Sequence, residues 1–243
     1  MLGADRADAI FGPPVWSGYV RFEHADPVAG NLDFRRALAY AIDREALAAA
    51  CPANLMVATG GVVPPALQGH TPDIALGYDP ELARACLDRS GYEGELELAG
   101  LAPLDDQWDE ILSAIAGSWE GALRRRVVVR SEVGEGRTRI TGWLPGYPDP
   151  EYYLRLLFQS TSRTNEGGFA DPVFDELIEA ARQERSDRGR LERFHEADRY
   201  AVAERVAVIP LVYGRSTAFV RPQVRGWWEF GKSSANFADL VVE

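Results

Sequence analysis

Residues 95–130 have a strand–helix–strand pattern, and this pattern limits the possible folds more than any other feature of the chain. Residues 95–101 alternate between apolar and polar side chains, and residues 126–130 are rich in valine. Between them, residues 105–123 carry apolar side chains at helical spacing: Trp108, Ile111, Leu112, Ile115 and Trp119. A second stretch with β-branched residues, Thr138, Ile140 and Thr141, predicts a strand over residues 137–143. Two strands joined through a helix form a βαβ-type unit packed on a sheet, so we expect an α/β fold.

Helix start signals recur along the rest of the chain. Asn31 and Asp43 each precede a helical pattern, over residues 32–42 and 44–51, and act as N-caps. Asp79-Pro80 and Asp171-Pro172 combine a cap with a proline in the first turn, and Gly91 is a typical helix stop. Further helices are expected over 151–159 and 187–205, and further strands over 16–22, 208–213 and 217–220. Residues 53–78, rich in glycine and proline, are too long for an ordinary loop and are expected to wrap a surface or to form a domain boundary.

Composition excludes several classes of protein. The chain has 243 residues, enough for one large or two modest domains, and 46% of them are hydrophobic, which is typical of a globular protein. Its 37 acidic and 26 basic residues give a net charge of −11, which argues against a nucleic-acid or anionic-membrane binder. No apolar run approaches a membrane span, and Asp5, Arg6 and Asp8 lie where a secretory signal would be apolar. The chain is therefore expected to be cytosolic, or part of a longer protein.

Enzyme motifs are weak in this sequence. Residues 226–233 match the phosphate-loop pattern G-x-x-x-x-G-K-[ST], but bulky Trp, Trp, Glu and Phe at the middle positions do not suit a backbone wrapped around phosphate. His24, His70 and His195 are scattered, so neither a metal site nor a catalytic histidine is expected. Cys51 and Cys86 are interpreted as buried free thiols, with one mutual disulfide as the alternative. We expect no catalysis, no cofactor and no metal.

The segment after residue 142 is the best candidate for a binding site. Trp143, Leu144, Gly146, Tyr147 and Asp149 lie on a loop that two prolines stiffen. Aromatic side chains beside a single carboxylate are typical of a small-molecule site. The alternative is a packed loop in which Trp143 belongs to the core and Asp149 caps the next helix.

The sequence resembles the extracellular solute-binding proteins of family 5, the oligopeptide, dipeptide and nickel binders of ABC importers. Residues 31–45, NLDFRRALAYAIDRE, are similar to a family signature. Further matching motifs follow in order: Pro64-Pro65, Tyr78-Asp79-Pro80, Ser90-Gly91-Tyr92, Gly142-Trp143, Tyr147-Pro148-Asp149-Pro150, Asn165, Gly168-Phe169, Phe174-Asp175, Ile209-Pro210-Leu211, and Val224 with Gly226. The motifs extend over residues 20–226.

The resemblance implies the C-terminal lobe of a two-lobed periplasmic-binding-protein-like fold of class II, the peptide-binder type. Residues 31–205 would form the second ligand-binding lobe, and residues 1–30 and 206–243 would belong to the sheet of the first lobe. The ligand-binding residues implied are Trp143, Leu144, Gly146, Tyr147 and Asp149. In peptide-binding relatives an acidic residue stands where this chain has Gly146, so the resemblance brings no anchor for a peptide amino terminus.

The function that the resemblance implies is capture of a peptide or other small solute by lobe closure, as part of an ABC importer. The expected partners are the ligand, the permease subunits and the missing N-terminal part of the same chain, in a periplasmic or membrane-anchored extracellular location. The alternative is a ligand-sensing domain of a cytosolic transcriptional regulator. Nucleic-acid binding and a membrane span are not expected for these residues.

Overall fold

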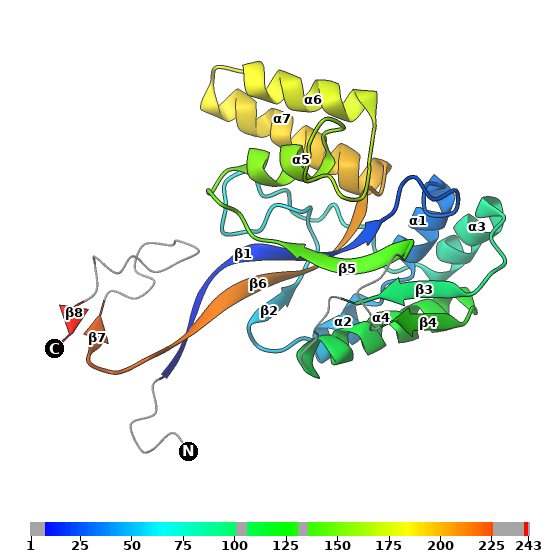
Figure 1. The fold of residues 1–243 in the computed structure, drawn as a ribbon, viewed down its shortest axis with the longest axis horizontal. Coiled ribbons are helices and arrows are strands. Elements are labelled where there is room, and N and C mark those ends of the chain that lie inside the picture. The colour runs from blue at the N-terminus through cyan, green and yellow to red at the C-terminus, as the bar shows by residue number, and fades with distance from the viewer. Residues whose placement is uncertain (1–7, 101–105, 131–135, 226–240, 243) are drawn as a thin grey trace.

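The computed structural model describes residues 8–100, 106–130, 136–225 and 241–242, and it confirms the α/β expectation (Figure 1). A six-stranded mixed sheet has the order β2-β6-β1-β5-β3-β4, and helices cover both of its faces. The strands are β1 (Asp8–Phe22), β2 (Leu55–Val57), β3 (Leu96–Ala99), β4 (Val127–Arg130), β5 (Thr138–Trp143) and β6 (Val208–Val220). A separate two-stranded sheet pairs β7 (Val224–Arg225) with β8 (Val241–Val242).

The helices divide between the two faces of the sheet. The first group contains α1 (Leu32–Tyr40), α2 (Arg44–Ala50), α3 (Pro80–Ser90) and α4 (Asp106–Leu123). The second contains α5 (Pro150–Phe158), α6 (Pro172–Gln183) and α7 (Asp187–Arg199), which continues into a π-helical turn, η1 (Tyr200–Glu204). No helix within the described ranges is long and apolar enough to cross a membrane.

The predicted βαβ unit is confirmed. Strand β3 pairs in parallel with β4, and α4 connects the two. Strand β5 joins the other side of β3, also in parallel, and then pairs antiparallel with β1. The β-branched residues at 127–129 fit this arrangement because they favour the pleated backbone.

Local capping fixes the helix starts where the sequence predicts them. The Asn31 side chain accepts hydrogen bonds from the backbone N–H groups of Asp33 and Phe34. Asp43, Asp79, Asp149 and Asp171 act in the same way at the starts of α2, α3, α5 and α6. Gly91 ends α3 with φ of 70°, in the left-handed region that glycine adopts without steric cost.

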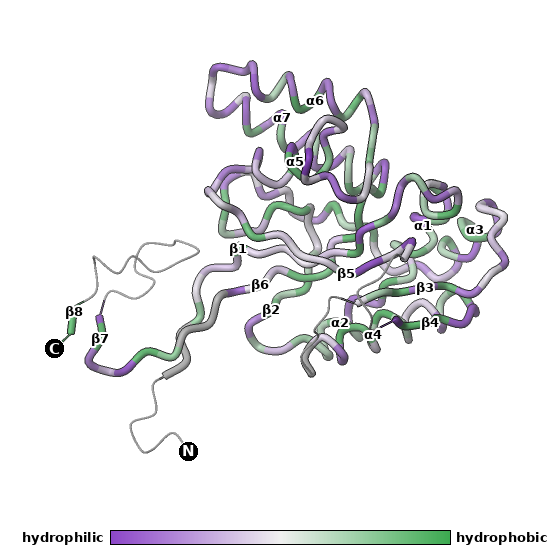
Figure 2. Tube along the Cα trace, viewed as in Figure 1, coloured by the Kyte–Doolittle hydropathy of each residue, from purple (hydrophilic) through white to green (hydrophobic). Residues whose placement is uncertain are grey.

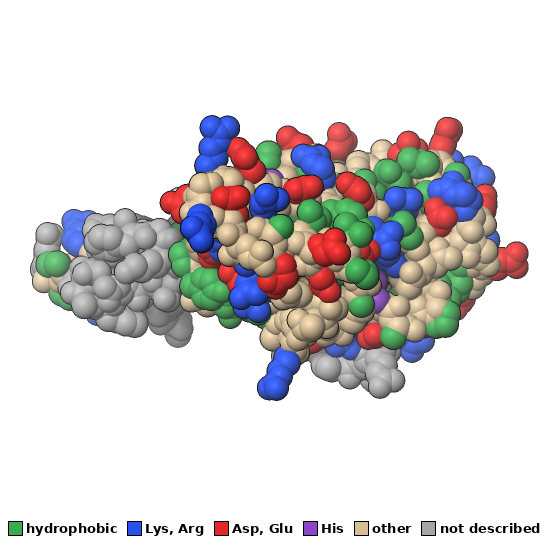
Figure 3. Space-filling model, turned by 90° about the horizontal axis from the view of Figure 1, so that it is seen from above, with side chains coloured by type: hydrophobic (Ala, Val, Ile, Leu, Met, Phe, Trp, Pro, Cys, Tyr) green, Lys and Arg blue, Asp and Glu red, His purple; other side chains and the backbone are tan. Residues whose placement is uncertain are grey.

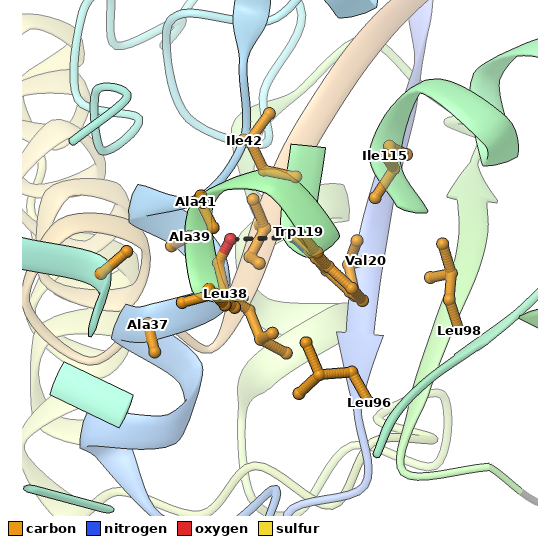
Figure 4. Close-up of a cluster of buried hydrophobic side chains, with 14 of the residues drawn as sticks. Val20, Ala37, Leu38, Ala39, Ala41, Ile42, Leu96, Leu98, Ile115 and Trp119 are labelled. Atoms are coloured by element: carbon orange, nitrogen blue, oxygen red, sulfur yellow. Dashed lines mark hydrogen bonds between the residues drawn. The ribbon is translucent and has the colours of Figure 1, made fainter. Parts of the chain in front are cut away.

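The core on the α1–α4 face is built around Trp119. This indole is fully buried and donates a hydrogen bond to the Leu38 carbonyl at 3.1 Å. Figure 4 shows Trp119 from α4 beside Leu38 from α1, with Val20 of β1 and Leu96 of β3 close by. The helical stripe predicted from Trp108 to Trp119 therefore faces this core, which joins α1 and α4 to the sheet.

The core on the opposite face belongs to α5, α6 and α7. Phe158, Phe169 and Phe174 pack edge to face, with ring centroids about 6 Å apart. Hydrophobic and hydrophilic residues alternate along α6 and α7, as an amphipathic helix on a sheet requires (Figure 2). Seen from this side, acidic and basic side chains intermix over the outer surface (Figure 3).

Residues 53–78 wrap a surface, as one of the two expectations proposed. The segment forms edge strand β2 beside β6, and Ala58 then donates a backbone hydrogen bond to Leu211. Its later part lies against α7, where the Val62 N–H donates to the Asp198 carboxylate at 3.2 Å. The segment therefore connects the sheet edge to the α5–α7 layer.

Three strand predictions and one helix prediction were wrong in extent. The strands predicted over 208–213 and 217–220 are one strand, β6, and the strand predicted over 16–22 begins at Asp8. These segments form because residues 8–22 and 208–220 pair with each other, which no local pattern encodes. The helix predicted over 187–205 changes at Tyr200 into a π-helical turn, closed by a hydrogen bond from Arg205 N–H to the Tyr200 carbonyl.

The end segments of the chain contribute directly to this sheet. Residues 17–22 of β1 pair with β5, and residues 208–214 of β6 pair with β1 and β2. The boundaries drawn at residues 30 and 206 therefore do not separate the sheet of residues 31–205 from the end segments. The assignment of the outer parts of these segments to a first lobe stays a prediction.

Two smaller expectations concern the thiols and the phosphate-loop match. Cys51 and Cys86 are free, which confirms the interpretation as thiols and excludes the mutual disulfide; Cys86 is buried, and Cys51 is partly buried. The phosphate-loop match at residues 226–233 lies outside the described residues.

Candidate functional site

The predicted binding loop follows β5 and leads into α5. Of its candidate residues, Trp143 and Asp149 turn towards the protein. The Trp143 indole N–H donates to the Tyr152 carbonyl at 3.0 Å, and its ring lies against the Tyr152 ring. Leu144, Gly146 and Tyr147 lie at the surface. The loop thus combines the two interpretations that the sequence leaves open.

Asp149 has a structural role. One carboxylate oxygen caps α5 by accepting from the Glu151 N–H at 2.8 Å, and Arg190 on α7 binds both oxygens, at 2.7 and 2.9 Å. Burial alone would raise the pKa of Asp149, but the hydrogen bonds from Arg190 and Glu151 and the Arg190 charge outweigh burial and lower it. The carboxylate expected as an anionic handle for a ligand is therefore paired with Arg190.

Tyr147 and Leu144 present apolar surface to solvent. Tyr147 is 44% exposed, and its ring contacts Tyr152 edge to face at a centroid distance of 4.7 Å. Gly146 lies beside the same ring, because a Cβ atom there would be 2.9 Å from the Tyr152 hydroxyl. Leu144 is 53% exposed and opens onto a pocket that the sequence does not predict.

We call this pocket the Trp16 pocket. It encloses about 320 Å³, and its described lining consists of Trp16, Asn54, Leu55, Trp108, Leu144, Gly214 and Arg215. The rings of Trp16 and Trp108 meet edge to face, with centroids 5.5 Å apart. Apart from Leu144, none of these residues is a candidate from the sequence, because they lie far apart in the chain and converge only through the sheet.

Three glycines on neighbouring strands form the floor under Trp16. A Cβ atom at Gly142 on β5, Gly214 on β6 or Gly18 on β1 would lie 2.2, 2.5 or 2.7 Å from atoms of the indole. Such separations are far below van der Waals contact, so larger residues would displace the Trp16 ring. The glycines therefore set the depth of the pocket. In the sequence, Gly142 stands out only as part of the Gly142-Trp143 motif. Nothing there indicates that Gly18 and Gly214 lie beside it under Trp16.

A second, smaller cavity lies behind Trp143, between β1, β5 and residues 164–169, and encloses about 80 Å³. Tyr19, His24 and Asn165 are among its lining residues. Asn165 closes the adjacent loop through two hydrogen bonds with the Phe169 backbone, at 2.7 and 3.2 Å. Burial and the Arg35 charge lower the pKa of His24 to about 4, so this histidine is neutral at pH 7.

The other histidines also have structural partners. His70 Nδ1 lies 2.7 Å from the Val63 carbonyl, and His195 Nδ1 lies 3.0 Å from the Thr71 hydroxyl. Within the described ranges, His, Cys, Asp and Glu side chains form no group of three that could hold a metal ion.

Tyr147 provides a test of which part of the loop is surface and which is core. We expect Tyr147→Ala to lower the free energy of unfolding by less than about 1 kcal/mol, because a half-exposed ring loses little buried area. Tyr153, fully buried on α5 with its hydroxyl donating to the Val15 carbonyl, is the matched control. Tyr153→Ala should cost about 3–5 kcal/mol. Chemical denaturation measures both, and equal losses would place Tyr147 in the core.

Solved structures of peptide- and solute-binding proteins are similar to this chain, and in those named here about half of the solved chain is matched. The substrate-binding protein CtaP of Listeria monocytogenes superposes with a TM-score of 0.84 at 16% identity, over 98% of this chain and 52% of that one. The Escherichia coli murein tripeptide-binding protein MppA gives a TM-score of 0.82 at 18% identity, over 96% and 49%. The class of protein is thus defined: the fold is that of one lobe of a two-lobed solute-binding protein.

The family follows from the sequence comparison. Residues 3–165 match the bacterial extracellular solute-binding proteins, family 5, and the chain belongs to this family. The dipeptide-binding protein of Escherichia coli is 25% identical over 246 aligned positions, which cover 93% of this chain and 45% of that protein. The oligopeptide-binding protein OppA of Bacillus subtilis is 24% identical over 80% of this chain and 42% of its own length. The resemblance to family 5 is therefore confirmed, and this family consists of binding proteins, not enzymes. The chain spans less than half the length of these two relatives.

Proposed function

We propose that this chain is the C-terminal ligand-binding lobe of the substrate-binding component of an ABC importer, which captures a peptide or another small solute. The ligand would lie between this lobe and a first lobe contributed by an N-terminal part of the same protein. Closure of the two lobes would be favoured by the ligand, because the ligand contacts both lobes only in the closed state.

The observation that carries this proposal is a partly exposed surface of apolar and aromatic side chains around the Trp16 pocket. Trp16, Trp108, Leu144 and Tyr147 lie there on or beside the loop that follows β5. Ligand sites are lined by apolar and aromatic side chains with few polar groups, and this surface has that composition. The family membership and the match to half of each relative point to the same function.

We assign the ligand contacts to Leu144, Tyr147 and the Trp16 pocket, with the Gly146 backbone beside them. Trp143 supports the loop from behind and lines the smaller cavity, and its place among the ligand contacts stays a prediction. Asp149 holds the loop to α7 through Arg190. We call the surface formed by Leu144, Gly146, Tyr147 and the Trp16 pocket the ligand face. The α5–α7 layer supports it through the contact between Asp149 and Arg190.

We further propose an extracytoplasmic location, periplasmic or anchored to the outer face of the membrane, and ABC permease subunits as partners. The matched family is described as extracellular solute-binding proteins, and MppA is described as periplasmic. They give no support to the alternative of a cytosolic regulator.

Calorimetry tests whether this chain alone provides only one half of the ligand site, which we call the half-site. Titrated with di- to pentapeptides, this chain alone should show no dissociation constant tighter than about 0.1 mM, equivalent to some 5–6 kcal/mol. The reason is geometric, because a single lobe cannot bury most of the surface of a ligand. A protein that also contains the N-terminal lobe should bind its ligand at micromolar concentration or tighter.

The control for this experiment is the same two-lobed protein with Tyr147→Ala, which should weaken binding by more than about tenfold, or 1.4 kcal/mol. A micromolar peptide ligand for this chain alone would contradict the half-site. A two-lobed protein that binds no solute would contradict the proposed function itself.

A further inference from the structure

The described residues of the ligand face present no charged side chain to a ligand. Apart from Arg215, the Trp16 pocket is lined by neutral groups: two indoles, two leucines, one amide and one glycine (Trp16, Trp108, Leu55, Leu144, Asn54 and Gly214). Tyr147 continues this surface outside the pocket with a half-exposed ring. Asp149 and Arg215 belong to the same segments of the chain, but their charged groups point to other partners.

Asp149 does not offer its charge to the ligand face. Arg190 donates to both carboxylate oxygens, at 2.7 and 2.9 Å, and the Glu151 N–H donates to one of them at 2.8 Å. These bonds hold the carboxylate against α7 and the start of α5. An ammonium group of a ligand would have to displace Arg190, whose bidentate, charge-assisted contact is among the stronger kinds of hydrogen bond.

The Arg215 guanidinium lies on the other face of the sheet. Gly214 faces Trp16, since a Cβ atom there would be 2.5 Å from the indole, and successive residues of a strand point to opposite faces. The Arg215 side chain accordingly contacts the sulfur of Met56, at 3.4 Å. Met56 in turn alternates on β2 with Leu55, which lines the pocket. Arg215 therefore gives the pocket no donor for a carboxylate.

A wall of this kind favours an uncharged group. Apolar ligand surface is stabilised there by its removal from water and by contact with the two indoles, whose centroids are 5.5 Å apart. A charged group would lose part of its hydration and find no counter-charge among the described lining side chains, which costs free energy. The pocket volume, about 320 Å³, is large enough for an aromatic ring or a branched aliphatic chain.

We propose that the ligand face binds an uncharged apolar or aromatic part of the solute, and that this lobe holds neither the ammonium nor the carboxylate end of a peptide. This inference rests on the proposed function, since it names the class of group that the ligand face recognises. Solutes that are neutral, or whose charged groups are held by the other lobe, fit this surface.

Benzamide, benzoate and benzamidinium test this selection on the chain itself. The three probes share one ring and nearly one shape, but at pH 7 they are neutral, anionic and cationic. Their binding is followed through the indole N–H signals of Trp16 and Trp108 in two-dimensional NMR spectra. We expect a millimolar dissociation constant for benzamide and about fivefold weaker binding, or weaker still, for either ion. Benzamidinium should bind better than benzoate, because indole faces attract cations and the chain has a net charge of −11.

Leu144→Glu places a carboxylate at the pocket, on a side chain exposed enough to be replaced without loss of the fold. In this variant benzamidinium should become the tightest of the three probes. Leu82→Glu is the matched control, because it changes the net charge equally on α3, outside the pocket lining, and benzamide should stay the tightest. The weak binding of benzoate should persist in about 1 M salt, because its cause is lost hydration and not long-range repulsion.

The outcomes separate the two levels of the proposal. If benzoate or benzamidinium binds as tightly as benzamide, or if Leu144→Glu keeps the wild-type order of affinities, the uncharged class is overturned and the proposed function stands. If no probe shifts either indole signal at concentrations up to about 50 mM, the pocket is not a ligand surface, and the proposed function loses its carrying observation.

Discussion

Replacing Arg35 with methionine should lower the free energy of unfolding by about 3–5 kcal/mol. Arg35 is buried, and its guanidinium donates to the carbonyls of Ala29, Gly30, Arg205 and Val206 at 2.7–3.0 Å. Methionine has a similar length but no donor, so four carbonyls would lose their partner. Burial, followed by the charges of Arg205 and Arg36, lowers the pKa of Arg35 to about 10, so it still carries its charge at pH 7.

The neighbouring Arg36 provides a matched control. Its guanidinium makes one exposed hydrogen bond, to the Glu204 carbonyl at 3.0 Å. Arg36→Met should therefore cost less than about 1 kcal/mol in chemical denaturation. If both substitutions lower the free energy of unfolding equally, the hydrogen bonds of Arg35 to the segments before α1 and before β6 do not stabilise the fold as proposed. Within the segment 31–45, Arg35 therefore has a structural role.

The second large effect is a pH dependence at Asp198. This side chain of α7 is fully buried against Gly61, accepts from the Val62 N–H at 3.2 Å, and leaves Oδ2 without a hydrogen-bond partner in the described residues. Burial raises the pKa of Asp198 to about 7, although the hydrogen bonds from Val62 and Thr71 and the Arg199 charge act in the opposite direction. Three other titratable groups face this cluster. His195 lies 3.0 Å from the Thr71 hydroxyl, the Tyr213 hydroxyl donates to the Gly61 carbonyl at 2.7 Å, and the Arg199 charge acts on Asp198.

The sign follows from proton binding. Between pH 4 and pH 7 the folded protein holds a proton on Asp198 that the unfolded chain has released, so this group costs stability as the pH rises. The cost is complete above pH 7. Asparagine does not titrate, so the stability of Asp198→Asn relative to wild type should increase by on the order of 2–3 kcal/mol between pH 5 and pH 8. Denaturation at both pH values gives this difference.

Comparison with wild type removes the contributions of other groups. His24, whose pKa is lowered to about 4, makes the fold more stable as the pH rises from 4 to 6.5, but it does so equally in both proteins. Asp88→Asn on α3, where the side chain is exposed, is the matched control for replacing a carboxylate with an amide at the surface. A constant difference between Asp198→Asn and wild type at both pH values would mean that Asp198 is charged in the fold throughout this range.

The sequence by itself determined the helix starts, the βαβ unit and the family. Asn31, Asp43 and Asp79 cap helices through bonds that reach only two or three residues along the chain, so a local pattern contains all the required information. The apolar spacing from Trp108 to Trp119 likewise fixed which face of α4 is buried. For the loop after β5 the sequence left two alternatives open, a binding loop and a packed loop, and could not assign its residues one by one.

Only the tertiary structure decided the pairing of β1 with β6, the partner of Asp149 and the composition of the Trp16 pocket. Residues 8–22 and 208–220 become long strands by bonding to each other across nearly the whole chain. Arg190, which donates hydrogen bonds to the Asp149 carboxylate, lies 41 residues further along the chain. The Trp16 pocket joins residues from β1, β6, α4 and the two loops that hold Asn54 and Leu144. Hydrophobic spacing specifies that a side chain is buried or exposed, but sheet order and register decide which distant side chains meet.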